Sequence, residues 1–199
     1  MPVSDDRPRV ALLTGEPGCG KSVLGGELSR ALRVPFIARD DVRGGLFLTA
    51  GAWSARPRRV PTADEAVEAF LRIVEATAGL GVSCIAEYVV RRARPGDLRR
   101  LTTVADCRVV HTWCRDAPAR LARRNAADRL LNRRPVLDAL GYSTIDAHTS
   151  AAVDGARSVT GDMRTDFEVP VLRVNTDDGY EPGLDAVIDF LVGGPPPIA

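Results

Sequence analysis

Lysine is almost absent from this chain of 199 residues, because 26 of its 27 basic residues are arginines. This bias is typical of a GC-rich genome. Lys21 is the single exception. A chain that otherwise uses arginine is expected to keep lysine where a compact ammonium is needed and a planar guanidinium fork fits badly. The scarcity of lysine therefore directs attention to the segment around residue 21.

Other scarcities exclude several classes of protein. Aromatic residues make up 5% of the chain, and no apolar segment is long enough to cross a bilayer. Four cysteines and two histidines show no metal-ligand spacing, so a zinc site is not expected and the thiols are expected to be reduced. No N-terminal stretch has the form of a signal peptide, so we expect a cytoplasmic protein without a membrane partner. With 45% hydrophobic and 27% charged residues, we expect one globular domain over 1–199, with a frayed tail at 193–199.

Lys21 lies inside a complete G-x-x-x-x-G-K-[ST] motif, Gly-Glu-Pro-Gly-Cys-Gly-Lys-Ser over 15–22. This motif is a phosphate-binding loop only where it joins a buried strand to a helix. The apolar run 10–13 precedes it, and Leu24, Leu28 and Leu32 follow at helical spacing. Both flanks therefore favour a P-loop for ATP or GTP. The residues predicted to contact the nucleotide are Gly15, Glu16, Pro17, Gly18, Cys19, Gly20, Lys21, Ser22 and Val23.

The rest of the chain alternates strand and helix patterns. Strands are expected at 9–14, 35–38, 82–87, 107–114 and 169–175. Helices are expected to about 33, after a capping box at 62–65, at 97–103, after Asp116 and around 184–191. Five such units predict an α/β domain with a parallel sheet and helices on both faces. We expect a lid and acceptor-binding region at about 117–165.

Ligands of such a sheet gather at the carboxyl ends of its strands. Asp40 follows the second predicted strand and is a candidate general base, which would accept the proton of an attacking hydroxyl. The alternative is a cap for a helix over 41–48, and Asp41 leaves room for both roles.

The P-loop together with 36–43 resembles the small P-loop kinases of the polynucleotide 5′-hydroxyl kinase, chloramphenicol phosphotransferase and zeta-toxin group. The resemblance is strongest over 9–45. It implies a nucleotide-kinase-like P-loop sheet in the order 2-3-1-4-5 and an arginine-bearing lid after the fourth strand. It also implies that Asp40 is the base and that Arg43 contacts the acceptor.

Candidate magnesium ligands are the Ser22 hydroxyl, Asp40 and Glu87, which ends the third predicted strand. A plain strand-end carboxylate is an equal alternative for Glu87. After the fifth strand, the segment from Asn175 through Thr176 to Asp178 lies where related kinases pack the adenine base, although Asn, Asp and Thr are also common turn residues. Asn175 is the residue of this segment named as a nucleotide contact. Cys19 lies close to Lys21 at a helix start, where a thiol with a lowered pKa would be sensitive to oxidation that blocks the nucleotide.

Residues 91–134 hold thirteen arginines and four acids, a local balance of +9 in a chain with net charge +1. Lid arginines that close over the transferred phosphoryl group would explain this excess. We name Arg124 and Arg129 as catalytic candidates and Arg120 as a nucleotide contact. The alternatives are a solvated helix face and a nucleic-acid track. The only aromatic residue in the run, Trp113, is predicted to be buried in a strand, which argues against base stacking.

These patterns predict an ATP- and Mg²⁺-dependent kinase whose acceptor is a hydroxyl of a small molecule. A sugar, a nucleoside or an antibiotic would fit, and antibiotic inactivation in a producing bacterium would suit the arginine bias. A polynucleotide 5′-hydroxyl kinase is the first alternative. A nucleotide-dependent switch or assembly ATPase without an organic acceptor is the second.

Overall fold

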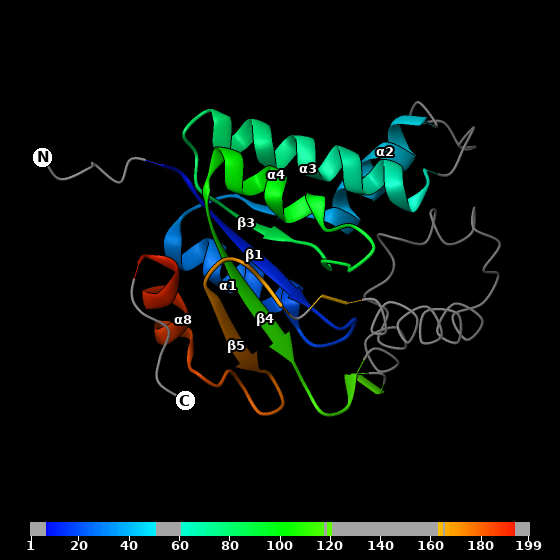
Figure 1. Ribbon diagram of the computed structural model, residues 1–199. Coiled ribbons are helices and arrows are strands. Elements are labelled where there is room, and N and C mark those ends of the chain that lie inside the picture. The colour runs from blue at the N-terminus through cyan, green and yellow to red at the C-terminus, as the bar shows by residue number, and fades with distance from the viewer. Residues whose placement is uncertain (1–6, 51–60, 118, 121–162, 165, 194–199) are drawn as a thin grey trace, which may run out of the picture.

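The computed structural model describes residues 7–50, 61–117, 119–120, 163–164 and 166–193. Figure 1 shows one sheet covered by helices on both faces. The five strands are β1 (Arg9–Gly15), β2 (Phe36–Ala38), β3 (Cys84–Glu87), β4 (Asp106–Trp113) and β5 (Val171–Asn175). The helices are α1 (Lys21–Leu32), α2 (Arg39–Ala50), α3 (Ala63–Gly79), α4 (Gly96–Val104) and α8 (Leu184–Leu191).

The sheet is parallel and has the order β2-β3-β1-β4-β5, which confirms the predicted fold and strand order. The central strand β1 is buried on both faces, as its continuous apolar run predicts. Its register places Leu13 beside Glu87 of β3 and Thr14 beside His111 of β4. The carboxyl ends of β2, β3, β1 and β4 therefore form one edge, and the P-loop leaves from its middle.

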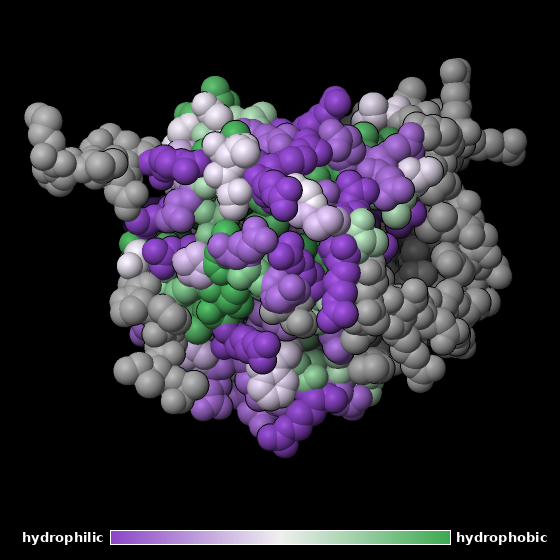
Figure 2. Space-filling view, in the orientation of Figure 1, coloured by the Kyte–Doolittle hydropathy of each residue, from purple (hydrophilic) through white to green (hydrophobic). Residues whose placement is uncertain are grey.

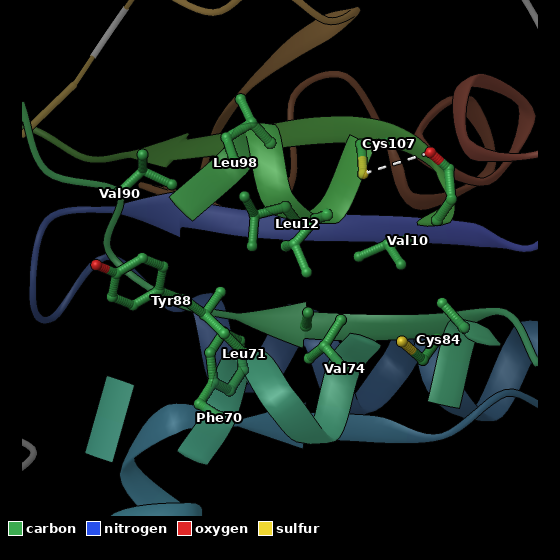
Figure 3. Close-up of a cluster of buried hydrophobic side chains, with 14 of the residues drawn as sticks. Val10, Leu12, Phe70, Leu71, Val74, Cys84, Tyr88, Val90, Leu98 and Cys107 are labelled. Atoms are coloured by element: carbon green, nitrogen blue, oxygen red, sulfur yellow. Dashed lines mark hydrogen bonds between the residues drawn. The ribbon is translucent and has the colours of Figure 1, made fainter. Parts of the chain in front are cut away.

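Two apolar clusters fill the two sides of the sheet. On one side, α3 and α4 pack on Val10 and Leu12 of β1. Figure 3 shows Leu71 and Val74 of α3 and Leu98 of α4 pointing at these two β1 residues. On the other side, α1 and α8 cover the alternate residues of β1, β4 and β5. Each fully buried large side chain contributes about 1.5–3 kcal/mol, so the sheet is a rigid support for the loops at its edge.

Local sequence signals mark two of the helix starts. The predicted capping box of α3 is present, since Thr62 Oγ1 accepts from the Glu65 N–H and Glu65 Oε2 accepts from the Thr62 N–H. The helix predicted after Asp116 begins there, because Asp116 Oδ1 accepts from the Ala119 N–H at 3.4 Å.

Two expectations about exposure and helix bounds are wrong. Helix α2 runs from Arg39 to Ala50, so it begins two residues before and ends two residues after the helix over 41–48 that the capping alternative predicts. Trp113 is not buried, because it ends β4 and 42% of its surface is exposed. Among the described residues, the helices are too short or too polar to cross a membrane.

Candidate functional site

The P-loop wraps around the start of α1 and depends on its glycines. Gly15, Gly18 and Gly20 have φ values of 141°, 92° and 81°, which other residues rarely adopt. A Cβ on Gly15 would also lie 2.1 Å from the Thr112 carbonyl oxygen of β4. Both conformation and space therefore require glycine at position 15, and β4 fixes how closely the loop approaches the sheet.

The Lys21 ammonium is held against this loop. Nζ donates to the carbonyl oxygens of Gly15 at 3.0 Å and Glu16 at 2.8 Å, and the residue is buried. Gly20 is the N-cap of α1, and no described side chain caps this helix. The first-turn amides and the positive end of the helix dipole are therefore directed at the space inside the loop, beside the ammonium. This arrangement suits a polyphosphate, as predicted.

Ser22 and Glu87 lie together at the carboxyl ends of β1 and β3. The Ser22 hydroxyl donates to Glu87 Oε1 at 3.1 Å. A hydroxyl and a carboxylate are oxygen donors of the kind that Mg²⁺ prefers, with phosphate oxygens and water completing its shell. The described residues contain no group of three or more candidate metal ligands, which is compatible with Mg²⁺ because this ion keeps several waters. The pair therefore fits a magnesium ion that arrives with a nucleotide.

Asp40 lies in the first turn of α2, two residues after the end of β2. Ala38 is the register partner of Glu87, so Asp40 leaves the same edge of the sheet as the Ser22–Glu87 pair. Its carboxylate is half exposed and pairs with Arg39 Nη1 at 2.9 Å. The predicted capping role is wrong because the helix starts before Asp40. The candidate base and magnesium ligand is therefore available on the solvent side of the edge.

Arg43 lies one turn after Asp40 on α2 and is partly buried. Its Nε is enclosed and makes no hydrogen bond in the described part of the chain. The Nε–H group therefore lacks a hydrogen-bond acceptor among the described residues. The contact of Arg43 with the molecule that receives the phosphoryl group stays a prediction.

Arg120 covers the other end of the P-loop. Its Nη1 donates to the carbonyl oxygen of Thr176 at 2.6 Å and contacts Thr176 Oγ1 at 3.0 Å. Thr176 Oγ1 donates to the carbonyl oxygen of Cys19, and Arg120 Nη2 lies 3.6 Å from the position of a Cβ on Gly20. The start of the predicted lid is therefore tied to the P-loop through the loop after β5.

Asn175 itself has a structural task in that loop. Its Oδ1 accepts from the Asp177 N–H, and its backbone pairs with Glu181. Thr176, not the Asn175 side chain, is the residue that contacts the P-loop.

Two further residues lie close to this end of the site. Burial and a hydrogen bond to Glu27 raise the pKa of Tyr180 to about 12. Val23 is 55% exposed at the first turn of α1 and lies open to a ligand.

The Cys19 thiol points into the protein. It donates to the carbonyl oxygen of Glu16 at 2.8 Å and lies 3.0 Å from Thr112 Oγ1. Burial raises the pKa of Cys19, although Lys21 opposes this effect. The suggested lowered pKa is therefore wrong, and a peroxide-sensitive thiolate at this position is not supported.

One site residue was not predicted, and two predicted ones cannot be placed. Thr112 of β4 was missed, and Thr176 was predicted only as part of the segment after β5; the structure shows that both hold the P-loop at Cys19. Both are polar residues at the ends of apolar strands, which is the one signal the sequence offered. Arg124 and Arg129 lie outside the described residues, as does most of the region predicted as a lid.

Three solved structures share this fold over nearly the whole chain. A candidate kinase from Chloroflexus aurantiacus j-10-fl has a TM-score of 0.66 and 22% identity, covering 94% of this chain and 97% of that one. A sugar kinase from Janibacter sp. HTCC2649 has a TM-score of 0.59 and 13% identity, covering 93% and 94%. A gluconokinase from Sinorhizobium meliloti 1021 has a TM-score of 0.53 and 14% identity, covering 94% and 91%.

Neither a family model nor a curated protein sequence matches the chain. At these identities the structural likeness shows the fold alone. The resemblance to the polynucleotide kinase, chloramphenicol phosphotransferase and zeta-toxin group stays a prediction. The strand order, the P-loop and the three structures together establish the fold of small P-loop kinases.

Proposed function

We propose that the protein is a kinase that transfers the γ-phosphoryl group of ATP to a hydroxyl of a small molecule, with Mg²⁺ as cofactor. The observation that carries this proposal is the Ser22–Glu87 hydrogen bond beside the Lys21 loop, at the edge where Asp40 also lies. The proposed triphosphate site and the proposed base thus lie at one edge of the sheet, with β3 between the strands β1 and β2 that lead to them. Neither feature alone distinguishes a kinase from a nucleotide switch.

Each site residue has a separate role in this proposal. The P-loop amides and Lys21 hold the phosphates, and Arg120 with Thr176 borders the nucleoside end. Ser22 and Glu87 would hold magnesium, which when bound neutralises charge on the phosphate oxygens. Asp40 accepts the proton as the acceptor oxygen attacks the γ-phosphorus and ADP leaves. Lid arginines, among them Arg124 and Arg129, would close over the transferred group and exclude water.

The direct test is to incubate the purified protein with ATP, Mg²⁺ and a panel of sugars, sugar acids, nucleosides and antibiotics. Mass spectrometry should detect a product heavier by one phosphate, and Asp40→Asn should remove it. An antibiotic among the products would support a resistance role. Equal ATP consumption with and without every acceptor would instead favour a switch or assembly ATPase.

A second candidate is the polynucleotide 5′-hydroxyl kinase, which the exposure of Trp113 favours. The ring is 42% exposed and is followed by the exposed Arg115, so one stacking residue is available in the arginine-rich region. Labelling of an oligonucleotide with a 5′-hydroxyl, with steep loss at higher salt, would support this candidate. Absence of labelling at low salt would remove it.

A further inference from the structure

A cavity of about 240 Å³ lies at the opposite end of the sheet from the P-loop. Its described walls are the amino ends of β1, β3 and β4 and the carboxyl ends of α1 and α8. Figure 1 shows α8 and the beginnings of β1 and β4 at the left, away from the arrowheads of the strands. Strand β1 separates the cavity from the P-loop by about 20 Å, since a strand rises about 3.3 Å per residue. A molecule in this cavity would therefore not touch the nucleotide site.

Most of the cavity wall is apolar. The apolar side chains that line it include Ala11, Leu32, Val34, Ile85, Leu191 and Val192. Three of these belong to the apolar cluster beneath α1 and α8, and Leu32 and Val34 pack against that cluster. The cluster does not fill the space between the two helix ends and the sheet. An apolar cavity of about 150 Å³ is large enough to bind benzene, so this cavity has room for a small aliphatic molecule.

The charged residues of the cavity wall are of one sign. Two arginines, Arg9 and Arg108, and no acid are among the described residues that line it. Arg108 Nη1 donates to the carbonyl oxygen of Phe190 at 2.6 Å, and its guanidinium lies 5.3 Å from the centre of the Phe190 ring. Arg9 Nη2 lies 3.2 Å from the position of a Cβ on Gly193. Both guanidinium groups are thus positioned beside the end of α8.

One carboxylate lies beside both arginines, outside the cavity wall. Asp106 Oδ2 is 3.6 Å from Arg9 Nε and 3.8 Å from Arg108 Nε. Charge-assisted hydrogen bonds between such groups are about 2.7–2.9 Å long, so neither of these contacts is a close one. The two guanidinium groups and this carboxylate together have a net charge of +1. An apolar cavity with positive charge beside it is complementary to a molecule that has an apolar chain and an anionic end.

We propose that this cavity binds an aliphatic carboxylate, with its chain against Leu32, Val34 and Leu191 and its carboxylate beside Arg9 and Arg108. The guanidinium fork matches the planar carboxylate in shape and charge. Burial of the chain supplies the hydrophobic part of the binding free energy. The site goes beyond the proposed kinase function and does not rest on it, because it shares no residue with the P-loop edge.

Calorimetry of the full-length protein without nucleotide tests this proposal. Butyrate, hexanoate and octanoate are titrated in turn, and 1-hexanol is the neutral counterpart of hexanoate. We expect affinity to rise about four-fold for each methylene that enters the cavity. Hexanoate should bind about ten- to a hundred-fold more tightly than 1-hexanol, the range of one or two hydrogen bonds to a charged group. Equal affinity for butyrate and octanoate, or for hexanoate and 1-hexanol, would overturn the proposal.

Two pairs of variants locate the binding site. Arg9→Gln should remove most of the preference for hexanoate over 1-hexanol. Arg7→Gln should keep it, because Arg7 is exposed, donates to the Thr102 carbonyl oxygen and does not line the cavity. Val34→Phe should fill the cavity and remove octanoate binding, whereas Ile73→Phe adds the same ring at an exposed position of α3 and should preserve it. Equal effects within either pair would overturn the proposal.

A shortened protein tests a different occupant of the cavity. The chain continues after Gly193 with Gly-Pro-Pro-Pro-Ile-Ala, which supplies an isoleucine and a terminal carboxylate of its own. The octanoate titration is repeated with a protein that ends at Gly193. Equal binding by the two proteins would support a cavity that is open to a separate molecule. Binding by the shortened protein alone would assign the cavity to the tail of the chain and overturn the proposal.

Discussion

The arginines on or near α3 and α4 differ in their bonding partners from the arginines at the carboxyl ends of the strands. On the α3–α4 face, Arg100 donates to both Glu68 and Glu75, and Arg94 donates to Asp97. Figure 2 shows hydrophilic residues gathered over these two helices. At the carboxyl ends of the strands, Arg43 and Arg91 make no such bond to an acid that the structure describes. Charge that described acids balance stabilises the fold, whereas Arg43 and Arg91 have no such role among the described residues.

The largest expected effect comes from removing the candidate base at the carboxyl edge. Asp40→Asn should lower the rate of phosphoryl transfer by about 10²–10⁴-fold, because the acceptor hydroxyl then keeps its proton. Steady-state kinetics with the acceptor found in the panel would measure this. Asp41→Asn is the control, since Asp41 lies in the same helical turn and should change the rate little. Equal losses in the two variants would remove Asp40 from the role.

Gly15→Ala should distort the conformation of the P-loop without removing a catalytic side chain. The new methyl group meets the Thr112 carbonyl oxygen, and a positive φ for alanine adds strain of about 1–3 kcal/mol. We expect a lower midpoint in urea and loss of ATP binding. Gly45→Ala is the control, because no atom lies within 4 Å of its added Cβ and α2 should gain about 0.5–1 kcal/mol. A Gly15→Ala protein of normal stability and affinity would contradict the described loop.

Arg100→Gln tests the structural half of the comparison. Exposed ion pairs contribute little singly, so a loss of about 1 kcal/mol in unfolding free energy is expected for this network. Transfer activity should be unchanged. Arg91→Gln should leave the stability in urea unchanged, because the Arg91 side chain makes no ion pair to a described residue. If Arg91→Gln destabilises the protein more than Arg100→Gln does, the distinction between the two regions fails.

The smallest effect concerns His111 and pH. Burial, with Arg173 and Lys21 nearby, lowers the pKa of His111 from its ordinary value of 6.5. The unfolded state therefore binds this proton more readily, so stability is full above pH 6.5 and falls as the pH drops toward the folded-state pKa. His111→Gln should reduce the difference in unfolding free energy between pH 7 and pH 5. An unchanged difference would show that the imidazole is protonated in the folded state.

The sequence predicts the fold well because the signals are local. The apolar run of β1, the spacing of the Lys21 motif and the Thr62 capping box each depend on a few adjacent residues. The ends of α2 were predicted less well, since the helix expected over 41–48 runs from Arg39 to Ala50. Gly44 and Gly45 lower the helix propensity of this segment, and it has no capping pattern as clear as that of α3.

The site is predicted only in part because its contacts join distant residues. Lys21 and Ser22 belong to a motif, but Thr112 and Thr176 reach Cys19 from positions 93 and 157 residues away. Pairing across strands, which no single stretch of sequence specifies, also brings His111 beside Thr14. That no described residue pairs with the side chains of Arg43 and Arg91 depends on the folded chain and not on any short stretch of sequence.

The central claim is that the loop around Lys21 binds a nucleoside triphosphate. Calorimetry of the purified protein with ATP and Mg²⁺ tests it most directly. We expect saturable binding of one ATP per chain, weakened at least about ten-fold in Lys21→Ala because the buried ammonium makes charge-assisted hydrogen bonds. No detectable heat with ATP or GTP, or equal affinity in Lys21→Ala, would contradict the account.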